Sequence, residues 1–162
     1  VAVIIDGMTS LARAYNLISS HSGRQASSGV DASALYLPKR FFGAGRKLEE
    51  GGSLTVFASV LSGTSSKLDE MLLQELQGGS TSEIFLSQET AEAHIFPALN
   101  IGKSGTQNEE GLTSPEQVSQ VQKLREELRE ANSAGNPSSG MELLLQKITS
   151  TEDNESLLGN YS

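Results

Sequence analysis

The chain has 162 residues, a net charge of −8 at pH 7 and 36% hydrophobic residues, enough for one domain with a limited core. The absence of cysteine excludes disulfides, thiolate zinc sites and cysteine nucleophiles. The sequence has neither a run of about 18 apolar residues nor a signal-peptide start, so we expect a cytoplasmic protein with no membrane-spanning segment.

The first predicted element is a strand. Residues 1–5 form an unbroken aliphatic run that ends at Asp6, which is typical of a strand buried on both faces in a parallel sheet. Because the chain starts on such a strand without an initiating Met, we expect it to be a piece of something longer or to have been trimmed. A helix is predicted next, capped by Thr9 or Ser10 and continuing to Ile18.

A polar loop and a second helix follow this first unit. Residues 19–29 are rich in serine and glycine, which predicts an exposed loop. Asp31 is expected to cap the next helical segment, and Pro38 is expected in the first turn of a helix that continues to Arg46. Residues 53–61 are β-branched and apolar, which predicts a second strand.

The middle of the chain alternates again between helix and strand. A short helix is predicted over 69–76, followed by strands over 82–86 and 94–101. The segment between these two strands is too short for a crossover helix, so we expect them to pair antiparallel. This alternation indicates an α/β fold.

The end of the chain is predicted to be helical. Ser114 and Gln117 flank Pro115 with the spacing of a capping box, which predicts a helix start. Ser139 and Glu142 repeat this pattern for a second helix. The other boundaries that we predict are Ile148 as the end of that helix, a last helix over 151–158, and a division of the domain into 1–107 and 108–162.

Charge is distributed unevenly along the chain. Residues 1–67 carry seven Lys and Arg against four Asp and Glu, whereas residues 108–162 carry four against ten. The first part can therefore meet a polyanion locally, while the overall acidity argues against nucleic-acid binding over the whole surface. Chance distribution of surface charge explains the asymmetry equally well.

Few residues carry recognisable chemistry by themselves. His21 and His94 are far apart and lack an HExxH pattern, so a zinc site has little support. The segment VAVIID (1–6) resembles a Walker B strand, whose terminal carboxylate holds the magnesium of a bound nucleotide. Alone this pattern is weak, because aliphatic runs that end in Asp are common.

The surrounding sequence is more specific. The segments DGMTSLARAYN (6–16), VDASALYLPKRFFGAGRKLEEGGSLTVFASVL (30–61), GTSSKLDE (63–70) and HIFPALNIGKSGT (94–106) resemble, in this order, the ATPase domain of the bacterial transcription termination factor Rho family. The similarity extends through 140–158 and covers the C-terminal half of that domain. RecA-like flagellar and type III export ATPases share the character of the first segment, but PKRFFGA and GTSSKLDE point to Rho.

The resemblance implies a fold and four site residues. The fold is a partial RecA-like sandwich of the P-loop NTPase type, with a mostly parallel sheet and a helical C-terminus. Asp6 matches the catalytic Walker B aspartate that serves Mg and ATP, and Phe96 matches the aromatic residue that packs on adenine. Arg24 and Lys67 match basic residues on the two RNA-binding loops of a central channel, where one cation per loop meets phosphates without reading sequence.

The chain departs from the family at several positions. Gln107 stands where the family has its arginine finger, which is worth about 10³–10⁵ in rate. Ser10 stands at another family arginine, and His94 also replaces a basic residue. The sequence 27–29 replaces the usual glycine pair of the first RNA loop.

The resemblance implies an RNA-dependent ATPase and helicase that translocates single-stranded RNA in a hexameric ring and acts on transcription termination with RNA polymerase as a possible partner. The sequence contains no GxxxxGK[ST] phosphate loop, so we expect the isolated chain neither to bind ATP well nor to hydrolyse it. Subunit contacts are expected from 38–47 and 102–112. Two alternatives stay open: a degenerate, non-catalytic Rho-like module for RNA binding or assembly, favoured by Gln107 and Ser10, and an export-ATPase relative with no RNA role.

Overall fold

The computed structural model describes residues 1–19, 32–133, 136 and 138–161. The chain divides into two compact units, Val1–Ser80 and Thr81–Ser162. Of the expected loop at 19–29, Ser19 still belongs to a helix, whereas residues 20–29 and the expected cap Asp31 lie outside the described residues. The proposed division into 1–107 and 108–162 stays a prediction.

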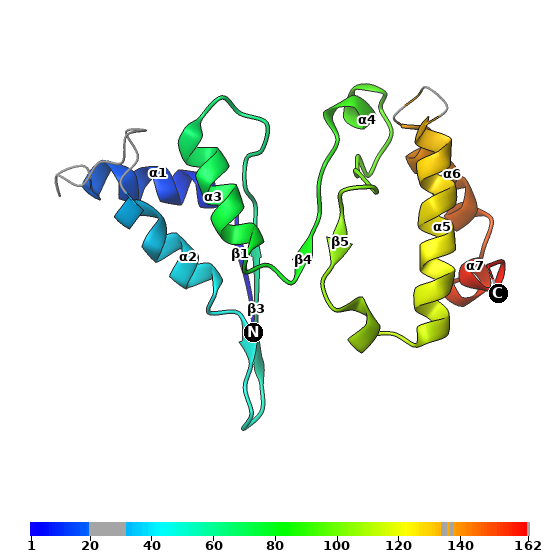
Figure 1. Ribbon diagram of the computed structural model, residues 1–162, viewed down its shortest axis with the longest axis horizontal. Helices are drawn as coiled ribbons and strands as arrows, with labels where there is room; N and C mark the ends of the chain where they lie inside the picture. Colours follow the sequence, from blue (N-terminus) through cyan, green and yellow to red (C-terminus); the bar gives the residue numbers. More distant parts are fainter. Residues whose placement is uncertain (20–31, 134–135, 137, 162) are drawn as a thin grey trace. The chain divides into compact units, whose positions relative to one another are not determined.

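The first unit is built on a three-stranded sheet in the order β1-β3-β2 (Figure 1). β1 (Ala2–Ile5) pairs in parallel with β3 (Ser53–Ala58), with Ile4 opposite Phe57. β2 (Arg46–Lys47) pairs with β3 in the antiparallel direction. The carboxyl ends of β1 and β3 therefore meet at one edge of the sheet, which is where open α/β sheets place their ligands.

The position of β1 corrects one expectation. Within the described chain it lies at an edge of the sheet, and Ile4 and Phe57 are 80% and 56% exposed. Helices cover one face of the sheet. Every second side chain of β1 and β3 points to the opposite face, where it is exposed. The prediction of a strand buried on both faces is therefore wrong for this chain.

Helices α1 (Met8–Ser19), α2 (Tyr36–Phe42) and α3 (Lys67–Gln77) cover the sheet, and a short 3-10 turn, η1 (Ala32–Leu35), precedes α2. Met8 and Ala12 lie one helical turn apart on α1 and are fully buried, which anchors this helix to the core. The buried core of the unit consists of Met8, Ala12, Leu35, Leu68, Leu72 and Leu76.

Helix α2 is shorter than predicted. It ends at Phe42, where the Gly43 N–H donates to the Lys39 carbonyl over 2.8 Å. Two glycines close together disfavour continuation of the helix, and Arg46 already belongs to β2. Pro38 is buried in the first turn, as predicted.

The second unit begins with a small antiparallel sheet of β4 (Ser82–Glu83) and β5 (Gly105–Thr106). Between them lie α4 (Gln88–Glu92) and an isolated antiparallel bridge of Leu86 with Leu99. The predicted antiparallel approach of these segments is present in that bridge. The continuous strand over 94–101 is wrong, because the residues after α4 form turns.

Three helices complete the second unit: α5 (Pro115–Ser133), α6 (Ser139–Thr149) and α7 (Asn154–Gly159), preceded by the 3-10 turn η2 (Glu109–Gly111). The capping box of α5 is confirmed: the Ser114 N–H donates to Gln117 Oε1 over 3.3 Å, and the Gln117 N–H donates to Ser114 Oγ over 3.2 Å. The cap of α7 is Asp153, which accepts from the Ser156 N–H, so this helix starts three residues later than predicted.

The helices α5, α6 and α7 pack around Leu124, Leu128 and Leu157. At the start of α6 the backbone of Gly140 approaches α5 so closely that a Cβ there would lie 2.5 Å from the Leu128 carbonyl oxygen. The Gly140 N–H donates to Asn132 Oδ1 over 2.7 Å. Among the described residues, every helix is too short or too polar to cross a membrane.

Candidate nucleotide and RNA site

Asp6 follows β1 at the carboxyl edge of the parallel strand pair. Its carboxylate is exposed and accepts a hydrogen bond from Ser59 Oγ over 3.0 Å. The same hydroxyl accepts from the Gly7 N–H over 2.8 Å, and Ser59 itself follows β3. The side chain that follows one strand therefore orients the carboxylate that follows its neighbour.

The turn between β1 and α1 fixes the direction of this carboxylate. Gly7 has φ +96°, a left-handed conformation that L side chains rarely adopt, and the Met8 N–H donates to the Ser59 carbonyl over 3.0 Å. Thr9 does not act as the predicted cap: α1 already begins at Met8, and Thr9 Oγ1 accepts from the Leu61 N–H over 3.1 Å. These two hydrogen bonds hold the turn between β1 and α1 against residues 59–61, which follow β3.

Lys67 lies at the start of α3, after the loop that leaves the carboxyl end of β3. Its side chain is exposed. Ser66 is the N-cap of α3, and its Oγ accepts from the Asp69 N–H over 3.4 Å. The helix start therefore presents the Lys67 ammonium to solvent on a backbone that is held by a cap.

Asp69 holds this loop to α1 and was not found by the sequence reasoning. It is buried, and its Oδ2 accepts from Arg13 over 2.7 Å and from Thr64 Oγ1 over 2.8 Å. Burial raises the pKa of Asp69, but the hydrogen bonds from Thr64 and Arg13 and the positive charge of Arg13 outweigh it, so the pKa lies below its ordinary value. The sequence indicates Asp69 only through its place in the segment GTSSKLDE (63–70), which resembles Rho.

Phe96 lies in the second unit, on the turn that follows α4. Phe96 is 64% exposed, and its peptide bond to Pro97 is cis. The Ile95 N–H donates to the Thr90 carbonyl over 3.1 Å, which fixes the residue before Phe96 to α4. His94 has φ +58°, a conformation uncommon for residues other than glycine. The turn thus displays an aromatic face to solvent.

Gln107 and Ser10, the two positions at which the resemblance implies a family arginine, are both exposed here. Gln107 directly follows β5, and its N–H donates to the Thr81 carbonyl over 2.8 Å. Ser10 lies in the first turn of α1, with its Oγ 3.4 Å from where a Gly7 Cβ would stand. Neither side chain carries a charge with which to neutralise phosphate oxygens.

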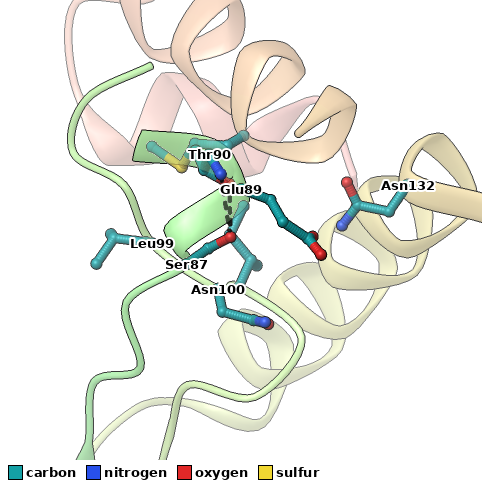
Figure 2. A pocket seen from close by; sticks show the side chains of 8 residues that line it. Ser87, Glu89, Thr90, Leu99, Asn100 and Asn132 are labelled. Carbon is teal, nitrogen blue, oxygen red and sulfur yellow. Dashed lines mark hydrogen bonds between the residues drawn. The ribbon is translucent and has the colours of Figure 1, made fainter. Parts of the chain in front are cut away.

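A cavity of about 240 Å³ lies in the second unit between α4 and the α5–α6 pair (Figure 2). Figure 2 shows Ser87 and Thr90 joined by a hydrogen bond beside it, with Asn100 and Asn132 on its other sides. Its lining consists of Ser87, Glu89, Thr90, Leu99, Asn100, Ile101, Asn132 and Met141. Phe96 is not part of this lining.

The residues fit a magnesium nucleotide in part. Magnesium bound with a nucleotide takes one or two carboxylates, phosphate oxygens and several waters, and the exposed carboxylate of Asp6 suits one such position. Among the described residues no group of three or more metal-ligating acidic or histidine side chains occurs. The phosphate side has no counterpart in the sequence, which contains no GxxxxGK[ST].

The sequence profile of the ATP synthase alpha/beta family, nucleotide-binding domain, matches residues 1–106. The chain belongs to this family. Within it the chain is 46% identical over 158 residues to transcription termination factor Rho of Micrococcus luteus and 44% identical over 158 residues to Rho of Thermotoga maritima. Each match covers 98% of this chain, against 22% and 36% of the relative. The predicted similarity to Rho is thereby confirmed.

Solved structures agree on the fold. A prototypical ATPase from the type III secretion system of pathogenic bacteria matches with a TM-score of 0.66 at 20% identity, over 97% of this chain and 43% of the other. The assembled ATPase EscN of enteropathogenic E. coli matches with a TM-score of 0.64 at 20% identity, over 99% and 39%. The predicted partial RecA-like α/β fold of this nucleotide-binding family is therefore confirmed.

The structure distributes the predicted site residues over both units. Asp6 and Lys67 belong to the first unit and follow the carboxyl ends of the two neighbouring parallel strands. Phe96 belongs to the second unit, as does Gln107. Arg24 lies outside the described residues. The roles of Asp6, Phe96, Arg24 and Lys67 stay predictions.

Proposed function

We propose that the chain is part of a Rho-like, RNA-dependent ATPase that moves along single-stranded RNA in the bacterial cytoplasm and acts on transcription termination. The observation that carries the proposal is identity of 42–46% with Rho proteins over 96–98% of the chain. The chain spans only 22–36% of these relatives, so ATP hydrolysis, helicase action, a hexameric ring and contact with RNA polymerase are all part of the proposal.

In this proposal Asp6 serves the magnesium of ATP. Its support is the position of the carboxylate at the carboxyl edge of two parallel strands, oriented by Ser59. Phe96 offers an exposed ring for the adenine base. A bound magnesium ion would neutralise charge on the phosphate oxygens, while Ser59 orients the Asp6 carboxylate and Phe96 contacts the base.

Lys67 and Arg24 are proposed to contact RNA phosphates. The support for Lys67 is its exposure at a capped helix start, beside a loop of small residues that lets a strand approach. Because a single ammonium contacts phosphate without reading a base, we expect binding with little sequence preference and a strong dependence on salt.

RNA binding by the pure chain tests this role. We expect Lys67→Glu to weaken binding of a fluorescent cytidine oligonucleotide by about tenfold, and to flatten the salt dependence by about 0.7 in logarithmic slope. The matched control is Lys123→Glu, which makes the same charge change at an exposed position in α5, outside the segments expected to contact other subunits. Equal losses in both variants, or no RNA binding at all, would contradict the RNA role and favour the export-ATPase alternative.

A second candidate function is a non-catalytic Rho-like module. Gln107 and Ser10 favour it, because neither supplies the positive charge that phosphoryl transfer uses. We expect the pure chain to show no RNA-stimulated turnover of magnesium ATP, since it has no phosphate loop. Measurable turnover that rises with cytidine RNA and disappears in Asp6→Asn would overturn both this expectation and the non-catalytic candidate.

A further inference from the structure

Phe96 lies on the turn of a hairpin formed by residues 85–100. Helix α4 occupies the first part of this hairpin, between Ser87 and the turn. The Ser87 N–H donates to the Ala98 carbonyl over 2.9 Å, and the Asn100 N–H donates to the Phe85 carbonyl over 2.8 Å. These bonds close the base of the hairpin, so the orientation of α4 determines where its far turn carries Phe96.

Thr90 is the junction of this hairpin. It is 1% exposed, and its carbonyl accepts from the Ile95 N–H, one residue before Phe96. Its N–H and its Oγ1 both donate to Ser87 Oγ, over 3.2 and 3.0 Å. The carbonyl, the N–H and the hydroxyl of Thr90 therefore join the cap of α4 to the turn that displays Phe96. Figure 2 shows the Thr90 side chain beside Ser87.

A second buried hydroxyl connects this junction to the C-terminal helices. Ser138 is 2% exposed, lies directly before α6 and donates from Oγ to Thr90 Oγ1 over 3.5 Å. Its hydroxyl does not cap α6, although caps are the common use of serine at that position. The Ser138 hydroxyl donates instead to Thr90, which is 48 positions away in the sequence.

The helix that carries Ser138 is itself held in place. Gly140 is bonded to Asn132, and it has no room for a Cβ against the Leu128 carbonyl. A cavity of about 240 Å³ borders the buried Thr90 on one side, so packing there is incomplete. The Ser138–Thr90 hydrogen bond therefore adds an orienting contact where packing is incomplete.

We infer that Thr90 is a positioning residue, through which Ser138 and the α5–α6 pair set the orientation of Phe96. This inference rests on the proposed function insofar as Phe96 meets the adenine base. On this inference, helices α5 and α6 support the turn that carries Phe96, through the contact of Ser138 with Thr90.

The test places 4-fluorophenylalanine at position 96 of the 162-residue chain and follows its fluorine NMR signal. Thr90→Val keeps the shape and loses the hydroxyl, while Thr90→Ser keeps the hydroxyl and loses a methyl group. We expect Thr90→Val and Ser138→Ala to shift and broaden the signal, and Thr90→Ser to restore it even where its unfolding midpoint is lowered. The control is Thr149→Val, an exposed threonine in the same unit.

An unchanged signal in both Thr90→Val and Ser138→Ala would overturn the inference, as would an equal shift in Thr90→Ser. If Thr90→Val does not fold, Ser138→Ala removes the same hydrogen bond from the other side and decides the question. A separate measurement is photolabelling of the chain by 8-azidoadenosine, which carries no phosphate and so does not need a phosphate loop. We expect Thr90→Val to lower the labelling about twofold to tenfold, the range for one neutral hydrogen bond, and a wild-type chain that is not labelled would contradict the adenine role of Phe96.

The two proposals fail in different ways. If Phe96→Ala leaves photolabelling unchanged, the adenine role of the proposed function is wrong, and the fluorine result still decides the role of Thr90. If Phe96→Ala abolishes labelling while Thr90→Val changes neither labelling nor the fluorine signal, the adenine role stands and the inference on Thr90 is overturned.

Discussion

The Arg13 guanidinium in α1 donates to the Asp69 carboxylate in α3 over 2.7 Å, which ties the helix after Asp6 to the helix that begins at Lys67. The two side chains are unequally exposed, 50% for Arg13 and 1% for Asp69. Asp69 Oδ1 is buried without a hydrogen-bond partner among the described residues. The hydrogen bonds from Arg13 and Thr64 to Oδ2 therefore stabilise the buried, ionised carboxylate of Asp69.

Asp69→Asn is expected to lower the free energy of unfolding by about 1–3 kcal/mol. The change removes a charge-assisted hydrogen bond and leaves an amide in a site whose donors, Arg13 and Thr64, need an acceptor. Urea unfolding at pH 7 followed by circular dichroism measures it. Glu70→Gln, at the exposed neighbouring position, is the control and should cost less than about 1 kcal/mol. Equal losses would show that the contacts of Asp69 contribute nothing specific.

The same carboxylate is expected to make stability depend on acid. The folded chain holds the pKa of Asp69 below its ordinary value of 3.8, so the unfolded chain binds the proton more tightly. Its stabilisation is complete above that ordinary value and is lost as the pH falls through the lowered folded pKa. Urea unfolding at a series of pH values below about 5 should show a steeper loss for the wild type than for Asp69→Asn. If the free energies of unfolding of the wild type and Asp69→Asn fall in parallel with pH, the carboxylate of Asp69 does not cause the acid dependence.

Local signals predicted helix starts better than distant contacts did. The capping box of α5 was predictable because Ser114 and Gln117 bond to each other within one helical turn. The sequence predicts Thr9 and Ser139 as caps, and both predictions are wrong: Thr9 and Ser139 already lie within α1 and α6. The hydroxyls of Thr9 and of Ser138, the residue before α6, meet Leu61 and Thr90, which are 52 and 48 positions away. A sequence pattern cannot distinguish a local partner from a distant one of the same chemistry.

The candidate site divides in the same way. Asp6 was predictable because a carboxylate at the end of an aliphatic run follows from strand periodicity alone. Asp69 was not, because its partner Arg13 is 56 positions away and its burial depends on how α1 packs against α3. The exposure of Ile4 was missed for a related reason, since an aliphatic strand reveals its hydrophobicity but not how many layers cover it.

Gly140→Ala is expected to destabilise the second unit by about 1–3 kcal/mol or more. The new methyl carbon would lie 2.5 Å from the Leu128 carbonyl oxygen, a backbone atom that cannot move without disturbing α5. Thermal unfolding of the variant measures the loss. The control is Gly159→Ala, where a Cβ meets nothing within 4 Å and the change should be small. A Gly140→Ala variant as stable as the control would mean that α5 and α6 do not approach this closely.

Tyr161→Phe is expected to lower the free energy of unfolding at pH 7 by about 1 kcal/mol, because one hydrogen bond to a partly exposed carboxylate is lost. The Tyr161 hydroxyl donates to Glu127, and Lys147 Nζ lies 3.0 Å from the other oxygen of that carboxylate. The hydrogen bond from Tyr161 and then that from Lys147 hold the pKa of Glu127 below its ordinary value.

The loss should therefore depend on pH. Because Glu127 titrates below its ordinary pKa in the folded chain, the stabilisation by Tyr161 is present at neutral pH and is lost as the pH falls through that lowered pKa. Urea unfolding should show a difference between wild type and Tyr161→Phe at pH 7 that shrinks in acid. Tyr36→Phe, at an exposed position in α2, is the control and should change stability little at either pH. A difference that stays constant with pH would assign the effect of Tyr161 to packing rather than to the ionised carboxylate.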